Sequence, residues 1–507
     1  MSGGDYAEAL SRFVSGDRDP TLFDAVLAAD PGHRAARLNR GVLRHQLGRD
    51  ADALADFDAL VALDPDDAGA RFNRATTRLR LGRTAEAAAD LALAAAQEPD
   101  AVDIRVQLVR VRLELGDVAA ALADAEAGLA RADAAPLHDI RGLALAACGR
   151  LAEAEAAFVA AVARDPALRD AHHNLGLVRD DLGRPDDALT AYAAAAALDP
   201  ADPEPRFCAA LARLARGDLA AAWPDFRRRH ARPGAPEPRH AHLPEWRGER
   251  LDAPLLLVSE QGFGDTLLFG RFAAAAARRA GAAILEAPAP LLPLFAEVPG
   301  LSVTDRFTGH AAARCGLPDL PAVLGVGDFS DLAAFPASYL AAPPARIAHW
   351  RQSLGDAAGP RLGIVWRGRA ETRTAPHLTR AIPLAALLGA LPPDADILPL
   401  QPVADPDDAR RLADDPRVRD AAPADFADTA ALATLCDLVV GADSGPIHAA
   451  LAVGAETWVL PPFSPDWRWS TAPDTTPWYP AARLLRQPAP ERWPLAALKR
   501  AVLDKFR

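Results

Sequence analysis

Two short segments combine glycines with an acidic residue at the point where an apolar run ends. The first is residues 255–266, LLLVSEQGFGDT, and the second is residues 437–450, DLVVGADSGPIHAA. Each pattern predicts a strand, a sharp loop and a helix start. Ligands bind beyond the carboxyl ends of parallel strands, and free N–H groups at a helix start attract anions. The two segments therefore predict a ligand site built from two similar loops.

In the first segment, Asp265 stands where a catalytic group would stand. The residues around it that would shape the loop are Glu260, Gln261, Gly262, Gly264 and Thr266. Glycines at such a place let the backbone approach a phosphate or sugar closely. The alternative is an ordinary βα turn in which the aspartate only caps the helix, and the segment alone leaves both interpretations open.

In the second segment, Ser444 and Gly445 lie at the predicted helix start, where free N–H groups would hold a diphosphate. His448 falls in the first helical turn and is either a ligand contact or a packing residue. For Asp443 a structural cap or a hydroxyl acceptor is favoured over a catalytic acid. The sequence therefore places the phosphate-binding half of the site here.

The N-terminal part of the chain, to about residue 230, repeats itself with a period of 34 residues. The marker glycines are Gly48, Gly82, Gly116, Gly149, Gly183 and Gly217, and the alanines five positions later are Ala53, Ala87, Ala121, Ala154, Ala188 and Ala222. Each unit predicts helix, glycine turn and helix, and the small alanine lets the helices approach. The pattern resembles the tetratricopeptide repeat (TPR), in about six units. The repeat array has two candidate roles: its concave groove recognises a peptide or protein, or the array braces the second half of the chain.

After the repeats, a basic and proline-rich segment leads into alternating strands and helices. We expect Arg227, Arg228 and Arg229 to be a solvated helix end, rather than a phosphate site, and Trp246 to pin the linker to the next domain. The predicted strands are 255–259, 283–286, 301–304, 362–366, 397–401, 438–441 and 457–460, with a closing amphipathic helix over 493–507. The predicted domains are repeats 1–230, linker 231–250, one α/β lobe at 251–350 and a second at 351–507.

Composition limits the function classes. Half of the 507 residues are hydrophobic, as in globular proteins, and the net charge of -12 disfavours nucleic acid and anionic membranes as partners. Cys148, Cys208, Cys315 and Cys436 form no Cys-x-x-Cys pair, so zinc and disulfides are not expected. No signal peptide or apolar span is recognised, which predicts a cytoplasmic protein. The dinucleotide fingerprint, the ATP phosphate loop and hydrolase elbows are missing from the sequence.

The second half resembles the heptosyltransferase-like group of GT-B glycosyltransferases, including bacterial proteins that carry this domain behind TPR repeats. The motifs that carry the resemblance are EQGFGDT at 260–266, GIVW at 363–366, DFADTA at 425–430, DSGPIH at 443–448 and PFSPDWRW at 462–469, with WYP at 478–480. The resemblance implies an α plus α/β architecture, a TPR solenoid followed by two Rossmann-like lobes.

The resemblance also implies roles for individual residues. Asp265 matches the general base that acts on the acceptor hydroxyl, and Asp443, Ser444, Gly445 and His448 match the loop that binds the donor phosphates. Where relatives have a small residue and Asn after the tryptophan, and Arg-Ser before an Ile-Pro-Leu motif, this chain has Arg367-Gly368-Arg369 and Arg380-Ala381. We therefore expect phosphate contacts to be shared among Arg367, Arg369, Arg373 and Arg380.

The expected function is transfer of a sugar from a nucleotide-sugar donor to a hydroxyl on a protein or glycan, with inversion and without a metal or cofactor. A helix start and arginines would stabilise the leaving diphosphate in place of Mg²⁺. The repeats would recruit the acceptor or a partner protein, and a homo-oligomer is compatible with the sequence. The alternative is a non-catalytic TPR scaffold whose transferase-like domain is degenerate.

Overall fold

The computed structural model describes residues 3–368 and 375–507, and the chain divides into two compact units, residues 1–175 and 176–507. The first unit is entirely helical in its described residues. Its elements are α1 (Gly3–Val14), η1 (Pro20–Phe23), α2 (Asp24–Ala29), α3 (Arg34–Gln46), α4 (Asp50–Leu63), α5 (Ala68–Arg80), α6 (Thr84–Gln97), α7 (Val102–Glu114), α8 (Val118–Leu129), α9 (Ala135–Ala147), α10 (Leu151–Arg164) and most of α11 (Arg169–Asp181).

The helices pair as the repeat period predicts. All six marker glycines have positive φ, between 71° and 92°, a conformation that side chains with a Cβ rarely adopt, so glycine ends each first helix without strain. All six marker alanines are fully buried, as close approach of the paired helices requires. The structure thus confirms the helix-turn-helix repeats.

Buried ion pairs join the two helices of the early repeats. In the second repeat, Arg74 and Arg78 of α5 each lie 2.6 Å from Asp90 of α6, and Arg71 lies 3.5 Å away. Asp56 of α4 is surrounded in the same way by three arginines of α3. Arginines at positions i, i+3 and i+7 share one helix face, so one aspartate can bind all three.

The second unit contains the end of the solenoid and two α/β lobes. The last repeat helices are α12 (Pro185–Leu198), α13 (Glu204–Arg216) and α14 (Leu219–Phe226), followed by η2 (Arg227–Ala231). They join the lobes directly: the Trp223 indole N–H donates to the Val326 carbonyl at 2.7 Å, and the Ala220 N–H donates to the Gly327 carbonyl at 2.8 Å. The last repeat is therefore part of the structure that carries the lobes.

The first lobe is built on a four-stranded parallel sheet with the order β3-β2-β1-β4. Its strands are β1 (Leu255–Val258), β2 (Ala283–Glu286), β3 (Leu301–Thr304) and β4 (Ala313–Gly316), and its helices include α15 (Phe263–Gly270), α16 (Ala273–Ala280), α17 (Leu292–Phe295) and α18 (Leu320–Val323), with short turns η3 (Ala289–Leu291), η4 (Leu317–Asp319) and η5 (Phe329–Ala334). Trp246 is fully buried, and its backbone N–H donates to Arg314 of β4 at 2.9 Å. The linker is pinned to this lobe as expected.

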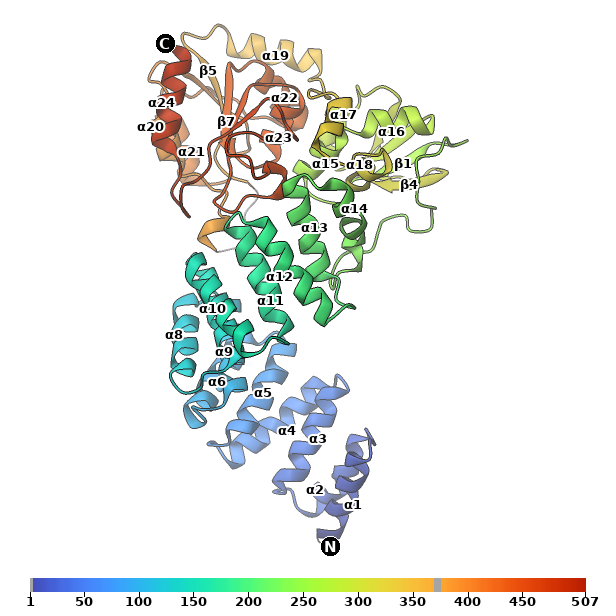
Figure 1. The fold of residues 1–507 in the computed structure, drawn as a ribbon, viewed down its shortest axis with the longest axis vertical. Helices are drawn as coiled ribbons and strands as arrows, with labels where there is room; N and C mark the ends of the chain where they lie inside the picture. The colour runs from blue at the N-terminus through green and yellow to red at the C-terminus, as the bar shows by residue number, and fades with distance from the viewer. Residues whose placement is uncertain (1–2, 369–374) are drawn as a thin grey trace. The chain divides into compact units, whose positions relative to one another are not determined.

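The second lobe is built on a five-stranded parallel sheet with the order β6-β5-β7-β8-β9. The strands are β5 (Arg361–Val365), β6 (Asp396–Pro399), β7 (Leu438–Ala442), β8 (Thr457–Leu460) and β9 (Ala482–Leu484). Helices α20 (Leu384–Ala390), α21 (Pro406–Asp414) and α24 (Leu495–Phe506) lie on one side of β5 and β7, and α22 (Phe426–Thr434) and α23 (Gly445–Ala452) lie on the other (Figure 1). The remaining elements are α19 (Pro344–Leu354), η6 (Pro376–Leu378) and η7 (Trp467–Trp469).

Strand residues alternate between two cores of this lobe. Leu362, Ile364, Leu438 and Val440 face α20 and α24, whereas Val365, Val439 and Val459 join a larger core. That larger core runs from Phe207 and Phe226 of the last repeat through the first lobe to α22 and α23. The lobes and the last repeat therefore share one hydrophobic interior.

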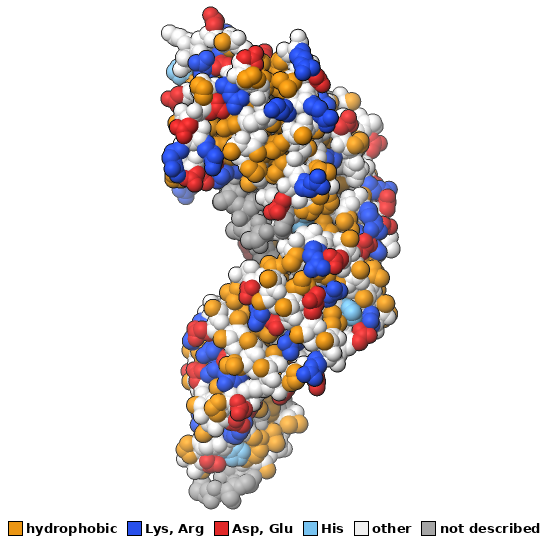
Figure 2. Space-filling model, turned by 90° about the vertical axis from the view of Figure 1, so that its left-hand side faces the viewer, with side chains coloured by type: hydrophobic (Ala, Val, Ile, Leu, Met, Phe, Trp, Pro, Cys, Tyr) orange, Lys and Arg blue, Asp and Glu red, His pale blue; other side chains and the backbone are white. Residues whose placement is uncertain are grey.

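On the face of the protein shown in Figure 2, basic and acidic side chains alternate among hydrophobic ones, and the described residues there form no broad patch of one charge. Within the described part of the chain, helices that combine the length and the apolar character needed to cross a membrane are not found.

Candidate functional site

A cleft of about 1260 Å³ lies where the two lobes and the last repeat meet. Its walls come from the loops after β1, β5 and β7, from residues 462–468, and from α13 and α14 of the last repeat. In each sheet, successive strands are added first on one side and then on the other. The change of side falls between β1 and β4 in the first sheet and between β5 and β7 in the second. These switch points are where parallel sheets open a crevice for ligands.

Asp265 lies in the first turn of α15 and lines this cleft, with about a fifth of its side chain exposed. Its carboxylate contacts the guanidinium of Arg468 from η7. Arg468 has no predicted role, because about two hundred residues separate it from Asp265 and no local pattern marks it. The predicted base is thus a cleft residue in an ion pair.

Arg468 bridges Asp265 and a second carboxylate, Asp466. One Nη atom contacts Asp466 and the other contacts Asp265, while the Arg468 backbone N–H donates to Asp466 at 3.1 Å. Burial lowers the pKa of Arg468 to about 10. Burial and the charge of Asp443 together raise the pKa of Asp466 to about 6. Two acids and one cation therefore share a confined corner of the cleft.

The rest of the first loop is held from behind. Glu260 is not a lining residue; it accepts from Arg229 Nε at 2.9 Å and lies 3.1 Å from His230. Arg229 also reaches Asp319 at 2.7 Å and is buried, so the expectation of a solvated arginine cluster is wrong for this residue. Arg229 is buried because two acids of the first lobe, which are distant in sequence, pack against this helix end.

The remaining loop residues follow the predicted turn. The Thr266 hydroxyl lies 2.6 Å from the Ser259 hydroxyl and 3.2 Å from the Gly262 carbonyl, which ties the end of β1 to the first turn of α15. Gln261 and Gly262 line the cleft. All five predicted loop residues thus lie at the carboxyl end of β1, beside Asp265.

The two predicted loops meet face to face. A Cβ on Gly264 would lie 2.8 Å from Cδ2 of His448, so only glycine allows α15 and α23 to approach this closely. Beside them the rings of Phe263 and Phe426 pack edge to face, with centroids 5.0 Å apart. Residues that the sequence assigned to separate lobes, such as Asp265 and Ser444, therefore line one cleft.

On the donor side, Asp443 is buried between two cationic or polar partners. Arg380 Nη1 lies 3.3 Å from its carboxylate and His448 Nε2 lies 3.4 Å away. Burial alone would raise the pKa of Asp443, but the hydrogen bond from His448 and the charge of Arg380 outweigh it and lower the pKa. Asp443 is thus held by an ion pair and a histidine contact. It does not form the structural cap that the sequence favoured, because the N-cap of α23 is Ser444.

Ser444 is the N-cap of α23, and its hydroxyl donates to the Ala442 carbonyl at 3.0 Å. Ser444 and Gly445 both line the cleft at the start of the helix. The N–H group of Gly445 belongs to the first helical turn, where intrahelical acceptors are missing. This end of the cleft has the chemistry to accept an anion.

His448 is buried, and its other ring nitrogen lies 2.8 Å from the Tyr479 hydroxyl. Its ring stacks on Trp469 with centroids 5.5 Å apart. Trp469, Trp478 and Tyr479 are fully buried and do not line the cleft. Trp467, by contrast, lines the cleft.

The other predicted arginines differ in position. Arg367 lines the cleft but pairs with Asp408 at 2.7 Å and Asp405 at 3.3 Å. Arg369 and Arg373 lie outside the described residues. Gln401, which the sequence did not single out, accepts from the backbone N–H groups of Trp366 and Arg367 at 2.9 and 3.1 Å and lines the cleft. Arg380 is therefore the predicted phosphate ligand that the structure brings to Asp443.

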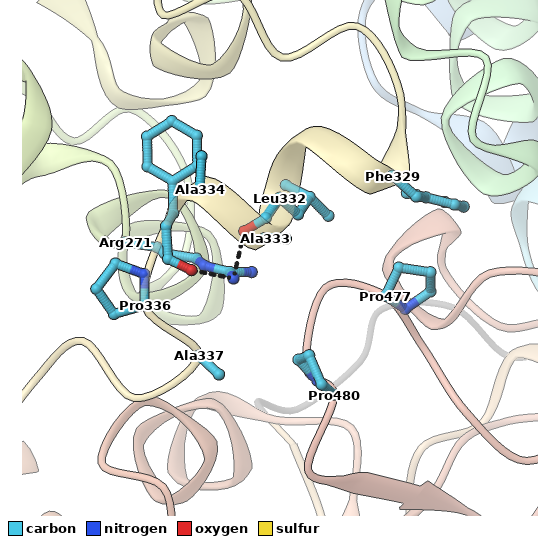
Figure 3. Close-up of a pocket in the computed structure, with 10 residues that line it drawn as sticks. Arg271, Phe329, Leu332, Ala333, Ala334, Pro336, Ala337, Pro477 and Pro480 are labelled. Atoms are coloured by element: carbon cyan, nitrogen blue, oxygen red, sulfur yellow. Dashed lines mark hydrogen bonds between the residues drawn. The ribbon is translucent and has the colours of Figure 1, made fainter.

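A second cavity of about 640 Å³ lies near η5. Its lining is mostly proline, alanine and phenylalanine around the buried Arg271 (Figure 3). Arg271 donates to the carbonyls of Leu332 at 2.9 Å, Phe335 at 2.7 Å and Trp478 at 3.2 Å. This arginine joins three chain segments. Among residues 3–368 and 375–507, no cluster of three or more His, Cys, Asp and Glu side chains is placed to hold a metal ion.

A sequence model of the tetratricopeptide-repeat family matches residues 21–68, 51–102, 141–203 and 173–236. The N-terminal part of the chain therefore consists of tetratricopeptide repeats, as the 34-residue spacing predicts.

Protein FlbA of Caulobacter vibrioides is 27% identical to this chain over 401 residues, which cover 70% of this chain and 64% of FlbA. The chain thus spans less than two thirds of the length of that relative.

Solved structures of repeat proteins are also similar. TTC0263 of Thermus thermophilus, a TPR protein, is 28% identical; the match covers 36% of this chain and 99% of TTC0263, with a TM-score of 0.32. A TPR protein of Parabacteroides merdae is 16% identical, with 45% and 92% coverage and a TM-score of 0.40. YrrB is 21% identical, with 36% and 94% coverage and a TM-score of 0.30.

Proposed function

We propose that this protein is a metal-independent glycosyltransferase that moves a sugar from a nucleotide-sugar donor to a hydroxyl acceptor. The observation that carries the proposal is the cleft in which Asp265, from one lobe, faces the α23 start and Arg380, from the other. A carboxylate opposite an anion-binding loop suits a reaction that deprotonates a hydroxyl and releases a diphosphate.

In the proposed reaction, Asp265 takes the proton of the acceptor hydroxyl while its oxygen attacks the anomeric carbon. The bond from that carbon to the diphosphate breaks, and its electron pair leaves with the nucleoside diphosphate. Arg380 and the N–H groups at Ser444 and Gly445 stabilise the leaving charge. The configuration at the anomeric carbon inverts because attack and departure occur on opposite faces.

We also propose that the repeats recruit a protein acceptor or partner, the usual role of a repeat solenoid. Phe207 and Leu211 of α13 line the same cleft as Asp265. A chain held along the last repeat could therefore present a hydroxyl to the cleft without leaving the repeat surface.

The second candidate function is a non-catalytic scaffold that senses a ligand in the cleft. One observation favours it: the Asp265 carboxylate is engaged by Arg468, and a base in an ion pair is a weaker proton acceptor. Under this proposal a nucleotide sugar binds but is not turned over.

The test is transfer from a panel of nucleotide sugars, combined with donor titration by tryptophan fluorescence, since Trp467 lines the cleft. Replacing Asp265→Asn should reduce transfer by about 10²- to 10⁴-fold, the usual contribution of a general base, and leave donor affinity unchanged. Asp252→Asn, at an exposed aspartate of the same lobe, should leave transfer intact. Full turnover by Asp265→Asn would exclude the base role, and donor binding without turnover by the natural chain would favour the scaffold.

A further inference from the structure

At the corner of the cleft around Asp265, one arginine lies between two acids. Arg468 contacts both Asp265 and Asp466, so one guanidinium faces two carboxylates. Only about a tenth of the Arg468 side chain is exposed, and its guanidinium carbon lies 4.5 Å from the ring centroid of Trp467. The guanidinium is hydrogen-bonded to Asp466 through one Nη, is in ion-pair contact with Asp265 through the other, and stacks on the Trp467 ring, which together fix its orientation.

We propose that Arg468 is the positioning residue for Asp265: its guanidinium directs the Asp265 carboxylate into the cleft, and Asp466 neutralises that guanidinium so that Asp265 keeps its basicity. The role of Asp265 as a base rests on the proposed transferase function. The contacts of Arg468 with Asp265 and Asp466, called the bridge below, do not depend on it. The bridge also explains how an aspartate in an ion pair can remain a base.

The charge balance supports the second half of the proposal. A lone arginine beside an aspartate stabilises the ionised carboxylate and so weakens it as a base. A second carboxylate on the same arginine offsets that effect. Burial and the charge of Asp443 raise the pKa of Asp466, whereas the charges of Arg380 and His448 lower it.

Other titratable groups also face this corner, and the test must leave them in place. They are His448 and Asp443 from the β7–α23 segment, Arg380 after η6, Tyr479 after η7, and Glu260 with Arg229 behind the Asp265 loop. None of the variants below changes these residues. A difference between the variants in the titration midpoint of Asp265 therefore reports on Arg468 and Asp466.

The experiment measures the titration of Asp265 directly, in full-length protein labelled with ¹³C at the aspartate side-chain carboxyl. The Asp265 resonance is identified by its loss in Asp265→Asn. Replacing Arg468→Met should raise the titration midpoint of Asp265 by about 1 to 3 pH units, because the favourable charge is gone. Asp466→Asn should lower the titration midpoint of Asp265, because the positive charge of Arg468 is then no longer offset by a second carboxylate. Arg468→Lys keeps the charge and should restore most of the natural midpoint.

The matched control is Arg486→Ala. Arg486 holds the same loop by donating to the carbonyls of Trp469 at 2.7 Å and Ser470 at 3.0 Å, and its side-chain hydrogen bonds all go to backbone oxygens. Loosening the loop in this way should leave the Asp265 midpoint in place. If the midpoint moves equally in Arg468→Met and Arg486→Ala, or does not move in opposite directions in Arg468→Met and Asp466→Asn, the proposal is wrong.

Transfer kinetics then connect the bridge to catalysis. The acid limb of kcat/KM against pH should move to higher pH in Arg468→Met and to lower pH in Asp466→Asn, with kcat reduced in both and KM for the donor little changed. If the carboxyl titration shifts as expected but the natural chain transfers no sugar, the bridge stands and the transferase proposal fails. If transfer occurs but the acid limb of kcat/KM does not shift with the titration midpoint of Asp265, Arg468 does not act through Asp265.

Discussion

Buried arginines, each shared between two partners, order the polar interior of the second unit. Arg468 joins Asp265 to Asp466, and Arg229 joins Glu260 to Asp319. A guanidinium has five donors in a rigid plane, which suits it to fix two carboxylates at once. Removing such a cation takes the charged partner away from acids that are largely shielded from water, which costs more than the loss of a surface ion pair.

Arg229 gives a residue-scale prediction for stability. Only 5% of its side chain is exposed, and it separates the carboxylates of Glu260 and Asp319. Arg229→Met should lower the free energy of unfolding by about 3–5 kcal/mol, because the buried Glu260 and the half-buried Asp319 lose the cation between them. The measurement is urea unfolding of the full chain followed by tryptophan fluorescence, which reports on the second unit.

The neighbouring Arg228 is the matched control, since its side chain is exposed. Arg228→Met should change the free energy of unfolding by less than about 0.5 kcal/mol, as is usual for surface positions. Equal destabilisation by the two variants would mean that the buried pair contributes no more than a surface charge, and would refute this account of Arg229.

The site could be predicted from the sequence only in part. Asp265 and Ser444-Gly445 were found because a glycine and an acid at the end of an apolar run are a local signal. Arg468 and Asp466 were missed because their significance depends on a contact with Asp265 made across the fold. The buried position of Arg229 was mispredicted for the same reason, because it depends on contacts with Glu260 and Asp319 that are distant in sequence.

At the scale of elements, every predicted strand is found within one or two residues of its place. Residues 283–286, 301–304 and 457–460 match β2, β3 and β8 in both bounds. The structure adds β4 and β9, which the sequence did not suggest. β4 reads Ala-Arg-Cys-Gly and β9 reads Ala-Arg-Leu, so neither has an apolar run, and pairing with β1 and β8 makes them strands.

The paired helices of the repeats give a prediction about local stability. Asp90 is 3% exposed and binds three arginines of α5. Asp90→Ala should lower the stability of α5 and α6 by about 3–5 kcal/mol, because three cations lose their shared partner inside the helix pair. Amide hydrogen exchange followed by peptide mass spectrometry should show faster exchange confined to these helices and their neighbours.

Asp58 provides the control on the preceding helix. It lies 3.0 Å from Arg74, one of the same arginines, but half of its side chain is exposed. Asp58→Ala should cost no more than about 1 kcal/mol, the usual value of a surface ion pair. If both variants accelerate exchange in α5 and α6 alike, burial of Asp90 is not what makes its ion pairs important.

At the scale of the whole molecule, the repeats and the lobes do not separate at the end of the repeat pattern. The 34-residue period ends near residue 230, which is why the sequence predicts a domain boundary there. The hydrophobic interior continues from Phe207 and Phe226 into the first lobe. The Phe226 ring packs edge to face on Trp467, with ring centroids 6.3 Å apart. A repeat period records local helix pairing, and it carries no information about which repeat is buried against another domain.

The shared interior predicts where the chain can be shortened. A chain that begins at Arg169 keeps α11 to α14 with both lobes, and it should unfold cooperatively. A chain that begins at residue 251 loses Phe226, Trp223 and Arg229, which exposes Trp467 and leaves Glu260 and Asp319 without their cation. It should be insoluble or lack a cooperative thermal transition in near-ultraviolet circular dichroism, because large apolar surfaces and buried acids cannot both be left uncovered. A sharp transition in the shorter chain, close to that of the longer one, would show that the lobes do not need the last repeat, whereas its loss would make that repeat a structural part of the cleft.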